Sequence, residues 1–305
     1  MCASTAIIAL KEEEQVKTMQ NEFSNQERAQ VLTQALPYIK RYTGQIVVVK
    51  YGGNAMVNES LKQQVMEDLV LLHLIGVKVV LVHGGGPEIN QVMEKMGKQA
   101  EFIDGLRVTD RETVDIVQMV LAGKINKTLV NLLHTKGGNA MGISGADGRL
   151  IEADFKDPRL GYVGAVTKVN ITPVLDLLEK GYIPVVSTIG CDAEGNTFNI
   201  NGDTAAAHIA GALGAKRLIM MTDVAGILRD PKDPETLIRE LSVDEAKALY
   251  SEGVISGGMI PKVDCCIEAI QKGVSRVIIM DGRVPHAILM ELLTNEGAGT
   301  MVKGA

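Results

Sequence analysis

The sequence predicts an α/β fold, an open and mainly parallel twisted sheet sandwiched by helices, and two observations lead to it. First, β-branched and apolar runs at 46–51 and 77–82 are each followed by a segment with helical spacing. Second, glycines follow both predicted strands directly, at 52–53 and 84–86. Because the carboxyl ends of parallel strands share one edge, and ligands bind at that edge, we expect the site there.

The remaining elements continue this alternation. We expect one long helix from Thr109 to about Lys136, followed by short strands that are antiparallel pieces on the edge or face of the first sheet. The other expected helices are 58–75, one starting at 87, 172–180, 204–213, 242–251, 259–272 and 286–294, and the other expected strands are 141–144, 150–153, 163–169, 183–188, 217–222, 274–280 and 300–302.

A helical segment from about 12 to 42 precedes the first strand and lies outside any strand–helix–strand unit. Within it, Ser24-Asn25-Gln26-Glu27 has the capping-box pattern, which favours two helices with a kink. An amphipathic helix without a sheet of its own is a candidate for docking on another subunit, and covering its own domain is an equal alternative. We therefore divide the chain into a helical extension, 1–43, and two lobes that share a central sheet, 44–195 and 196–305.

Composition bounds the class of protein. The 305 residues, 46% apolar and 22% charged, are ordinary for a soluble globular chain. A net charge of −6, no tryptophan and 3% aromatic residues argue against nucleic acid as a partner. No apolar run approaches the ~20 residues that span a membrane, and the first ten residues lack the basic start of a signal peptide. The four cysteines include no C-x-x-C pair, which fits a reducing cytoplasm.

The glycine clusters match neither the G-x-G-x-x-G nor the G-x-x-x-x-G-K-[ST] pattern, so any phosphate is held in another way. Lys50 and Lys262 both stand beside glycine-rich breaks, where a cation could meet an anionic ligand, although a solvated surface lysine is the commoner outcome. Asp203 is placed either to cap the next helix or to hold the two lysines. His83 has no partner carboxylate nearby in sequence, which favours a packed histidine over a general base.

Five segments stand out in order over roughly residues 44–305. They are Val49-Lys50-Tyr51-Gly52-Gly53-Asn54-Ala55-Met56, Val82-His83-Gly84-Gly85-Gly86-Pro87, Gly105-Leu106-Arg107-Val108-Thr109, Asn199-Ile200-Asn201-Gly202-Asp203 and Gly257-Gly258-Met259-Ile260-Pro261-Lys262. Together they resemble the motifs of the acetylglutamate kinases within the amino acid kinase family. By this resemblance, the segment 105–109 separates that group from the carbamate, aspartate, glutamate 5- and uridylate kinases.

The resemblance implies transfer of the γ-phosphoryl group of MgATP to the side-chain carboxylate of N-acetyl-L-glutamate, a step of arginine biosynthesis. A carboxylate with a reference pKa of about 4.3 is already ionised at neutral pH, so this chemistry needs no general base. The resemblance also implies that the first lobe holds N-acetyl-L-glutamate and the dimer interface, and that the second holds ATP. Magnesium would arrive with the nucleotide, without direct protein ligands and without a tightly bound prosthetic group.

The same resemblance assigns a role to each matching residue. Lys50 would bridge the transferring phosphoryl group, Lys262 would neutralise the leaving β-phosphate side, and Asp203 would orient both lysines. Arg107 would grip the α-carboxylate of the substrate as a two-pronged donor, and Asn199 would hydrogen-bond the same molecule. Backbone N–H groups complete the site, and they belong to Gly52, Gly53, Gly85 and Gly86.

The helical extension, together with the segment 295–301, resembles the arginine-inhibited hexameric branch, in which a trimer of dimers forms a ring. L-Arginine would bind between that helix and the second lobe, with Glu296 pairing its guanidinium and with Gly299, His286 and Tyr38 as neighbours. A PII-type nitrogen-signalling protein is a candidate regulator, because the family has such a partner in some lineages.

Three other classes of protein are alternatives. A kinase of the same fold that acts on another carboxylate or on a phosphate is opposed by the segment 105–109. A non-catalytic arginine sensor, or a scaffold for a PII-type protein, is opposed by the joint presence of Lys50, Lys262 and Asp203. A dehydrogenase that uses NAD is opposed by the missing dinucleotide fingerprint.

Overall fold

The structure, a computed structural model, describes residues 24–304. Helix α2 (Asn25–Tyr42) belongs to a unit separate from the compact unit that begins at Tyr42, and it is considered by itself. The predicted capping box at its start is confirmed, because Ser24 and Glu27 exchange side-chain and backbone hydrogen bonds. The earlier part of the predicted helix, 12–23, lies outside the described residues.

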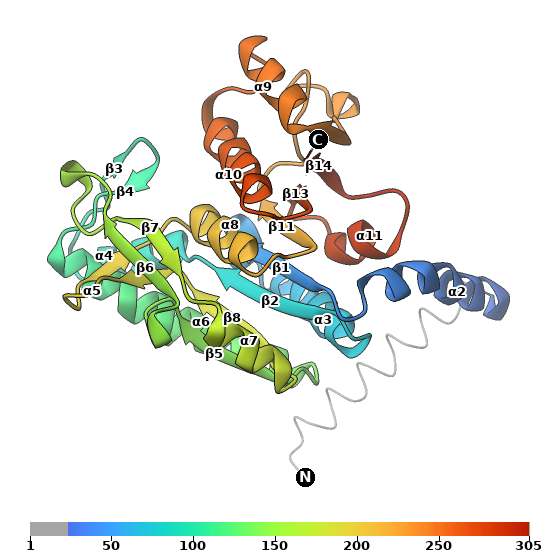
Figure 1. The fold of residues 1–305 in the computed structure, drawn as a ribbon, viewed down its shortest axis with the longest axis horizontal. Helices are drawn as coiled ribbons and strands as arrows, with labels where there is room; N and C mark the ends of the chain where they lie inside the picture. The colour runs from blue at the N-terminus through green and yellow to red at the C-terminus, as the bar shows by residue number, and fades with distance from the viewer. Residues whose placement is uncertain (1–23, 305) are drawn as a thin grey trace. The chain divides into compact units, whose positions relative to one another are not determined.

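One sheet of eight strands organises the compact unit, in the order β12-β14-β13-β11-β1-β2-β8-β5 (Figure 1). Neighbouring strands pair in parallel except β13 with β14. The predicted fold class is confirmed. The strands are β1 (Ile46–Tyr51), β2 (Lys78–His83), β5 (Ala140–Ser144), β8 (Ile183–Ser187), β11 (Arg217–Thr222), β12 (Glu240–Ser242), β13 (Arg276–Asp281) and β14 (Gly299–Lys303).

Each face of this sheet carries a separate apolar core, because alternate strand residues point to opposite faces. Val47 and Val49 of β1 belong to one core and Val48 to the other. Helices α3 (Glu59–Leu74), α4 (Gly86–Lys95), α5 (Arg111–Gln118), α6 (Asn126–Thr135) and α11 (Ala287–Leu293) contribute to the first core. Helices α7 (Thr172–Glu179), α8 (Gly202–Ala212), α9 (Val243–Ser251) and α10 (Ile260–Gln271) contribute to the second.

The first half of the chain supplies β1, β2, β8 and β5, and the second half supplies the other four strands. The two groups meet where β1 pairs with β11. In the sheet, β2, β8 and β5 lie on one side of β1, and the four strands of the second half lie on its other side. In open sheets of this kind, a crevice forms at the carboxyl ends of the strands where the connections diverge.

Two smaller sheets are formed by strands between residues 102 and 199, and one part of the prediction about this region is wrong. Strand β5 pairs in parallel with β8 inside the main sheet, so it is not one of the antiparallel pieces. The four-stranded sheet, in the order β10-β9-β6-β7, and the two-stranded hairpin stand apart from the main sheet. Their strands are β3 (Phe102–Ile103), β4 (Leu106–Arg107), β6 (Ile151–Phe155), β7 (Gly164–Val169), β9 (Ile189–Cys191) and β10 (Thr197–Asn199).

The predicted long helix at 109–136 is not regular. Helix α5 and helix α6 are joined by a π-helical segment, η2 (Met119–Ile125), which contains Gly123. A π turn widens the helix and shifts the side chains that follow, and such segments are frequent at functional sites. Here the segment places Leu121 in the wall of a pocket that lies at the carboxyl ends of β1 and β2.

No helix among residues 24–304 is long and apolar enough to cross a membrane.

Candidate active site

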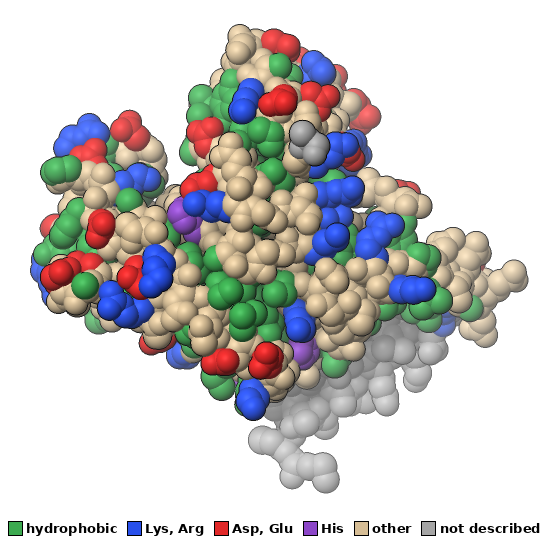
Figure 2. Space-filling model, in the orientation of Figure 1, with side chains coloured by type: hydrophobic (Ala, Val, Ile, Leu, Met, Phe, Trp, Pro, Cys, Tyr) green, Lys and Arg blue, Asp and Glu red, His purple; other side chains and the backbone are tan. Residues whose placement is uncertain are grey.

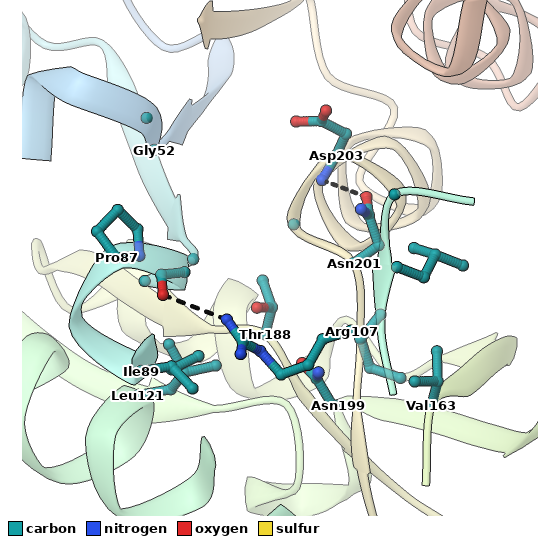
Figure 3. Close-up of a pocket in the computed structure, with 18 of the residues that line it drawn as sticks. Gly52, Pro87, Ile89, Arg107, Leu121, Val163, Thr188, Asn199, Asn201 and Asp203 are labelled. Atoms are coloured by element: carbon teal, nitrogen blue, oxygen red, sulfur yellow. Dashed lines mark hydrogen bonds between the residues drawn. The ribbon is translucent and has the colours of Figure 1, made fainter. Parts of the chain in front are cut away.

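A pocket of about 280 Å³ lies at the carboxyl ends of β1 and β2 (Figure 3). Its lining combines two glycine loops, 52–53 and 84–86, with Arg107 on one side and Asp203 on the other. A cavity of this size suits a small metabolite, since drug-sized ligands occupy roughly 300–1,000 Å³. The sequence prediction that the site lies at this sheet edge agrees with where the pocket is found.

Asp203 contacts both predicted lysines. Lys50 Nζ lies 2.9 Å from Asp203 Oδ1, and Lys262 Nζ lies 3.6 Å from Asp203 Oδ2. Lys50 is two residues after Val48 in β1, so its side chain leaves the strand on the same face of the sheet. That face is covered by α8, whose first turn holds Asp203. Burial opposes ionisation of Asp203, but the two ammonium groups outweigh it and hold the pKa of this carboxyl below its ordinary value.

Asn201, rather than Asp203, caps α8. The Asn201 side chain accepts hydrogen bonds from the backbone N–H groups of Asp203 and Thr204, at 3.0 and 3.1 Å (Figure 3). Because this cap satisfies the helix end, the Asp203 carboxylate is left to face the lysines. Of the two readings of Asp203 given by the sequence, the geometry therefore matches the one in which it holds the lysine pair.

Lys262 lies on the far side of Asp203, in an adjoining cavity of about 860 Å³. This cavity shares Asp203 and the tip of the β3–β4 hairpin with the main pocket. Figure 2 shows a recess between the part of the surface that carries the hairpin and the part that carries α10. The two lysines thus reach a single carboxylate from two connected spaces.

Each glycine loop holds a residue that is packed too closely for a side chain. A Cβ at Gly53, where φ is +72°, would lie 2.7 Å from Asp223 Oδ1, and a Cβ at Gly85 would clash with Ile125 Cδ1. Helix α4 begins directly after Gly85, with Pro87 in its first turn and no side-chain cap. Gly85, Gly86 and Pro87 line the pocket, so the start of this helix stands at its wall, and a helix start is a usual place for binding an anion.

Arg107 ends strand β4 and is 7% exposed. Its Nη2 donates to the Gly86 carbonyl at 3.3 Å (Figure 3). The same Nη2 donates to Asn90 Oδ1 at 2.6 Å, and the guanidinium lies 4.9 Å from the Phe102 ring centroid. None of the ion pairs within residues 24–304 includes Arg107. Burial lowers the pKa of this guanidinium, but an arginine stays charged in a protein. The pocket wall therefore holds a buried cation that has no carboxylate partner among residues 24–304.

Asn199 lines the same pocket, from the end of β10. Its side-chain nitrogen donates to Thr109 Oγ1 at 3.2 Å, and Thr109 in turn donates to the Arg107 carbonyl at 2.8 Å. Residues 107–109 and 199 are therefore linked although they are distant in sequence. The structure brings together all six predicted substrate-contacting residues, together with Lys50 and Asp203, around this pocket.

The predicted effector residues are placed differently. Glu296 is exposed and Gly299 begins β14, so both lie in one short segment. His286 stands at the start of α11 with φ of +54°, and its Nδ1 lies 2.6 Å from Asp68 of α3. Tyr38 lies in α2, the separately considered helix, with Arg41 5.5 Å from its ring centroid. The proposed arginine contacts stay predictions.

Several residues that support the pocket were not predicted from the sequence. Asn90 and Phe102 contact the Arg107 side chain, and Asp223 lies against Gly53 after β11. The hairpin that carries Arg107 had a visible signal, because Asp104-Gly105 is the dipeptide that favours a two-residue turn, and both residues have positive φ here, +51° and +77°. The other three depend on tertiary contacts.

The family is shown by comparison with known proteins. The model of the amino acid kinase family matches residues 45–281. That match covers more than half of the chain, which therefore belongs to the amino acid kinase family.

Curated relatives narrow this assignment. The chain is 51% identical over 280 residues to the acetylglutamate kinase of Clostridioides difficile (strain 630), with 92% of this chain and 98% of that protein covered. It is 49% identical over 280 residues to the acetylglutamate kinase of Synechococcus elongatus, with 92% and 93% covered. Within the family the chain therefore groups with the acetylglutamate kinases, enzymes that phosphorylate N-acetylglutamate in arginine biosynthesis. The resemblance seen in the motifs is confirmed, while its arginine-sensitive hexameric detail stays a prediction.

Solved structures agree on the fold. The N-acetylglutamate synthase from Neisseria gonorrhoeae, complexed with coenzyme A and N-acetyl-glutamate, has a TM-score of 0.79 at 26% identity, and 90% of this chain matches 63% of that one. The same synthase complexed with coenzyme A and L-arginine gives 0.74 at 25% identity, with 90% and 65% covered. The carbamate kinase of Giardia, at 19% identity and a TM-score of 0.65 over 86% of this chain and 99% of that one, shows the shared fold alone.

Proposed function

We propose that the pocket joins N-acetyl-L-glutamate to the γ-phosphoryl group of ATP, with Lys50, Lys262 and Asp203 as the catalytic group. One observation carries the proposal. The buried Arg107 guanidinium, which has no ion-pair partner within residues 24–304, shares a pocket with a carboxylate that already holds two lysines. Such a pocket calls for a ligand with one carboxylate for the arginine and with further negative charge on the lysine side.

The reaction forms one bond and breaks one. An oxygen of the substrate's side-chain carboxylate attacks the γ-phosphorus, and the bond from that phosphorus to the oxygen bridging to the β-phosphorus breaks. The products are an acyl phosphate and ADP, and no proton has to move because the carboxylate is already ionised. Two anions must approach each other, so catalysis consists of positioning them and stabilising charge on the equatorial oxygens.

The roles of the cations follow from their positions. Lys50, at the end of β1 beside Gly52, meets the phosphoryl group in transfer, and Lys262 lies on the side from which the leaving diphosphate departs. Lys262 stands in the first turn of α10, where a cation opposes the helix dipole, and an anionic ligand would relieve that conflict. Asp203 keeps both ammonium groups oriented before the nucleotide binds.

Magnesium belongs to the nucleotide in this proposal. Among the described residues, no three His, Cys, Asp or Glu side chains stand together as a ligand set. Magnesium bound to the phosphates supplies further neutralisation of their charge.

Arg107 fixes the orientation of the acceptor. Asn90 and the Gly86 carbonyl both accept from its Nη2 and so fix the position of the guanidinium, which would grip the α-carboxylate of the substrate. Asn199 reaches the same pocket from β10 and would donate to the substrate while Thr109 holds it in place. Closure of the recess over the reacting groups would exclude water, which protects an acyl phosphate from hydrolysis.

One coupled assay tests the proposal. ATP consumption is measured with N-acetyl-L-glutamate and with L-glutamate as acceptors. We expect turnover only with the acetylated substrate. Turnover on glutamate without activity on its acetylated form would contradict the substrate assignment.

We further propose feedback inhibition by L-arginine in a hexamer. Two observations support it. Helix α2 exposes Val31, Leu32 and Leu36 at 60–74%, which suits a contact with another subunit, and the structurally similar gonococcal synthase is known with L-arginine bound. Adding arginine to the assay tests the regulation. The site of action would be the cytoplasm, where ATP is available, and a PII-type protein is a further candidate partner.

A further inference from the structure

His83 is a buried titratable side chain that the proposed chemistry does not use. It ends strand β2 and is fully buried, and the glycine loop 84–86 follows it directly. Val79, Leu81 and His83 are alternate residues of β2, so their side chains lie on the same face of the sheet. The His83 ring therefore points away from Lys50 and toward the layer that holds η2 and α6. It therefore stands behind the loop rather than inside the pocket.

Two contacts fix the imidazole ring. Its Nδ1 lies 2.9 Å from the Gly84 carbonyl oxygen, and its Nε2 lies 3.2 Å from Nδ2 of Asn126. A carbonyl oxygen can only accept, so Nδ1 carries the hydrogen. An amide nitrogen donates, so Nε2 is the acceptor. Both contacts require the neutral Nδ1–H tautomer, and burial agrees with this because it lowers the pKa of His83 to about 4.

Asn126 is itself held at the junction of η2 and α6. Its Nδ2 also contacts the carbonyl oxygens of Val185 and Ile143, at 2.9 and 3.2 Å. Its Oδ1 accepts from Lys127 Nζ at 3.0 Å. The network therefore ties the end of β2 to β5, β8 and the end of the π-helical segment, so the ring is held by three strands and a helix.

The glycine loop is constrained from the other side as well. Gly85 packs against Ile125 and Leu121 of η2, with no room for a Cβ, and the Gly86 carbonyl accepts from Arg107. The His83 contact fixes the peptide plane that joins Gly84 to Gly85, and that plane carries the Gly85 N–H. The Gly86 carbonyl belongs to the peptide with Pro87, which has no N–H, so the Arg107 contact holds the end of the loop in place. Releasing Gly84 would therefore free the Gly85 N–H to turn away from an anion.

We propose that His83, locked by Asn126, is a positioning residue for the glycine loop that meets the transferring phosphoryl group. The inference rests on the proposed phosphoryl transfer at this pocket. It assigns His83 no proton transfer. Its effect is expected mainly on the turnover number, because a loop contact that strengthens in the transition state contributes there rather than to ground-state binding.

The test compares three variants with a control. His83→Phe keeps a ring but loses both contacts, Asn126→Leu loses the partner of Nε2, and His83→Asn keeps an amide N–H that can reach the Gly84 carbonyl. Val186→Ala, in the neighbouring strand and equally buried, is the control for a loss of stability alone. For each, kcat, both KM values and the melting temperature are measured.

We expect His83→Phe and Asn126→Leu to lower kcat roughly 10–100-fold with both KM values changed little. His83→Asn should recover most of kcat, and Val186→Ala should lower the melting temperature while leaving kcat unchanged. If His83→Phe retains full kcat, or if kcat and melting temperature fall together in all four variants, the positioning role is overturned.

A second measurement separates this inference from the proposed function. Nitrogen-15 NMR of the wild-type imidazole at neutral pH should show a protonated Nδ1 and an unprotonated Nε2. An Nε2–H tautomer or a doubly protonated ring would refute the network even if the kinase activity is found. A wild-type protein without that activity but with the expected tautomer would instead refute the proposed function.

Discussion

At the residue scale, the pocket is built from charges that do not cancel locally. Two lysines share the single carboxylate of Asp203, which leaves an excess of positive charge, and among residues 24–304 Arg107 contacts only neutral partners. A buried charge without an opposite partner costs free energy in the isolated protein. An anionic substrate offsets this cost on binding, so the imbalance is a physical reason for the pocket to bind acids.

The lysines give the first prediction. Lys50→Ala and Lys262→Ala should each lower kcat by roughly 10²–10³, the usual effect of removing a group that stabilises the transition state. Lys168→Ala removes an exposed lysine that pairs only with Glu152, and its kcat should match that of the wild type. Steady-state kinetics with saturating substrates decide the matter. A loss as large in Lys168→Ala as in the other two would remove the special role of the lysine pair.

Asp68 gives a prediction about stability and pH. Burial raises its pKa to about 6 although His286 contacts it. The folded protein binds this proton more tightly than the unfolded chain, so the contribution of Asp68 to the free energy of unfolding falls as pH rises between about 4 and 6. Urea denaturation should show that Asp68→Asn gains stability relative to the wild type over this range. A difference between the two proteins that does not change with pH would contradict this account.

At the element scale, the β3–β4 hairpin sets the position of Arg107. Its turn, Asp104-Gly105, lies at positive φ, and its strand β4 ends with the guanidinium that reaches the pocket. The hairpin has only two residues in each strand, so its geometry depends strongly on the turn.

Gly105→Val tests this dependence. A β-branched residue at φ of +77° is strained by about 1–2 kcal/mol, so the turn should change and displace Arg107. We expect a several-fold higher KM for N-acetyl-L-glutamate with the KM for ATP unchanged. Gly195→Val imposes the same kind of strain on the turn before β10, at φ of +86° and away from Arg107, and serves as the control. Equal effects of both substitutions on the acceptor KM would contradict the role of the hairpin.

Elements with a strong periodic signal could be predicted from the sequence, and those fixed by tertiary contacts could not. Strand β1 matches its prediction at both ends, since four β-branched residues and two glycines mark it. The π-helical segment was missed because its periodicity resembles that of an ordinary helix, and what distinguishes it is the packing of Leu121 and Ile125 on Gly85. The strand β12 was missed because three residues carry too little pattern.

The same division holds for the site. Lys50 could be singled out because it stands beside glycines that a tight turn or a close approach requires, whereas Arg107 was assigned only through the resemblance of the segment 105–109. Asn90 carried no such signal, because its role depends on where α4 meets the hairpin. Asn201 was not predicted as a helix cap, although its side chain caps α8.

At the scale of the whole molecule, the two halves of the chain share one sheet and meet at the pairing of β1 with β11. Lys50 comes from one half, and Asp203 and Lys262 come from the other. A small change in the angle between the halves would therefore alter the distances among these three groups. This arrangement provides a physical route by which a distant effector could change the rate.

Helix α2 is the element through which we expect such regulation. Deleting residues 1–40 removes the exposed apolar residues Val31, Leu32 and Leu36 of this helix. The variant should form dimers, as measured by light scattering, and its activity in the coupled assay should be insensitive to arginine. Leu32→Glu keeps the helix and places a charge among these apolar residues, and it should have the same effect. A deletion variant that stays hexameric and inhibited would refute the proposed assembly.

The central claim is that Arg107 binds the α-carboxylate of the acceptor while Lys50 acts on the phosphoryl group. The most direct test is the kinetics of Arg107→Ala beside Lys50→Ala, with kcat and both KM values measured. We predict that Arg107→Ala chiefly raises the KM for N-acetyl-L-glutamate, whereas Lys50→Ala chiefly lowers kcat. An Arg107→Ala enzyme with an unchanged KM for the acceptor would contradict the claim.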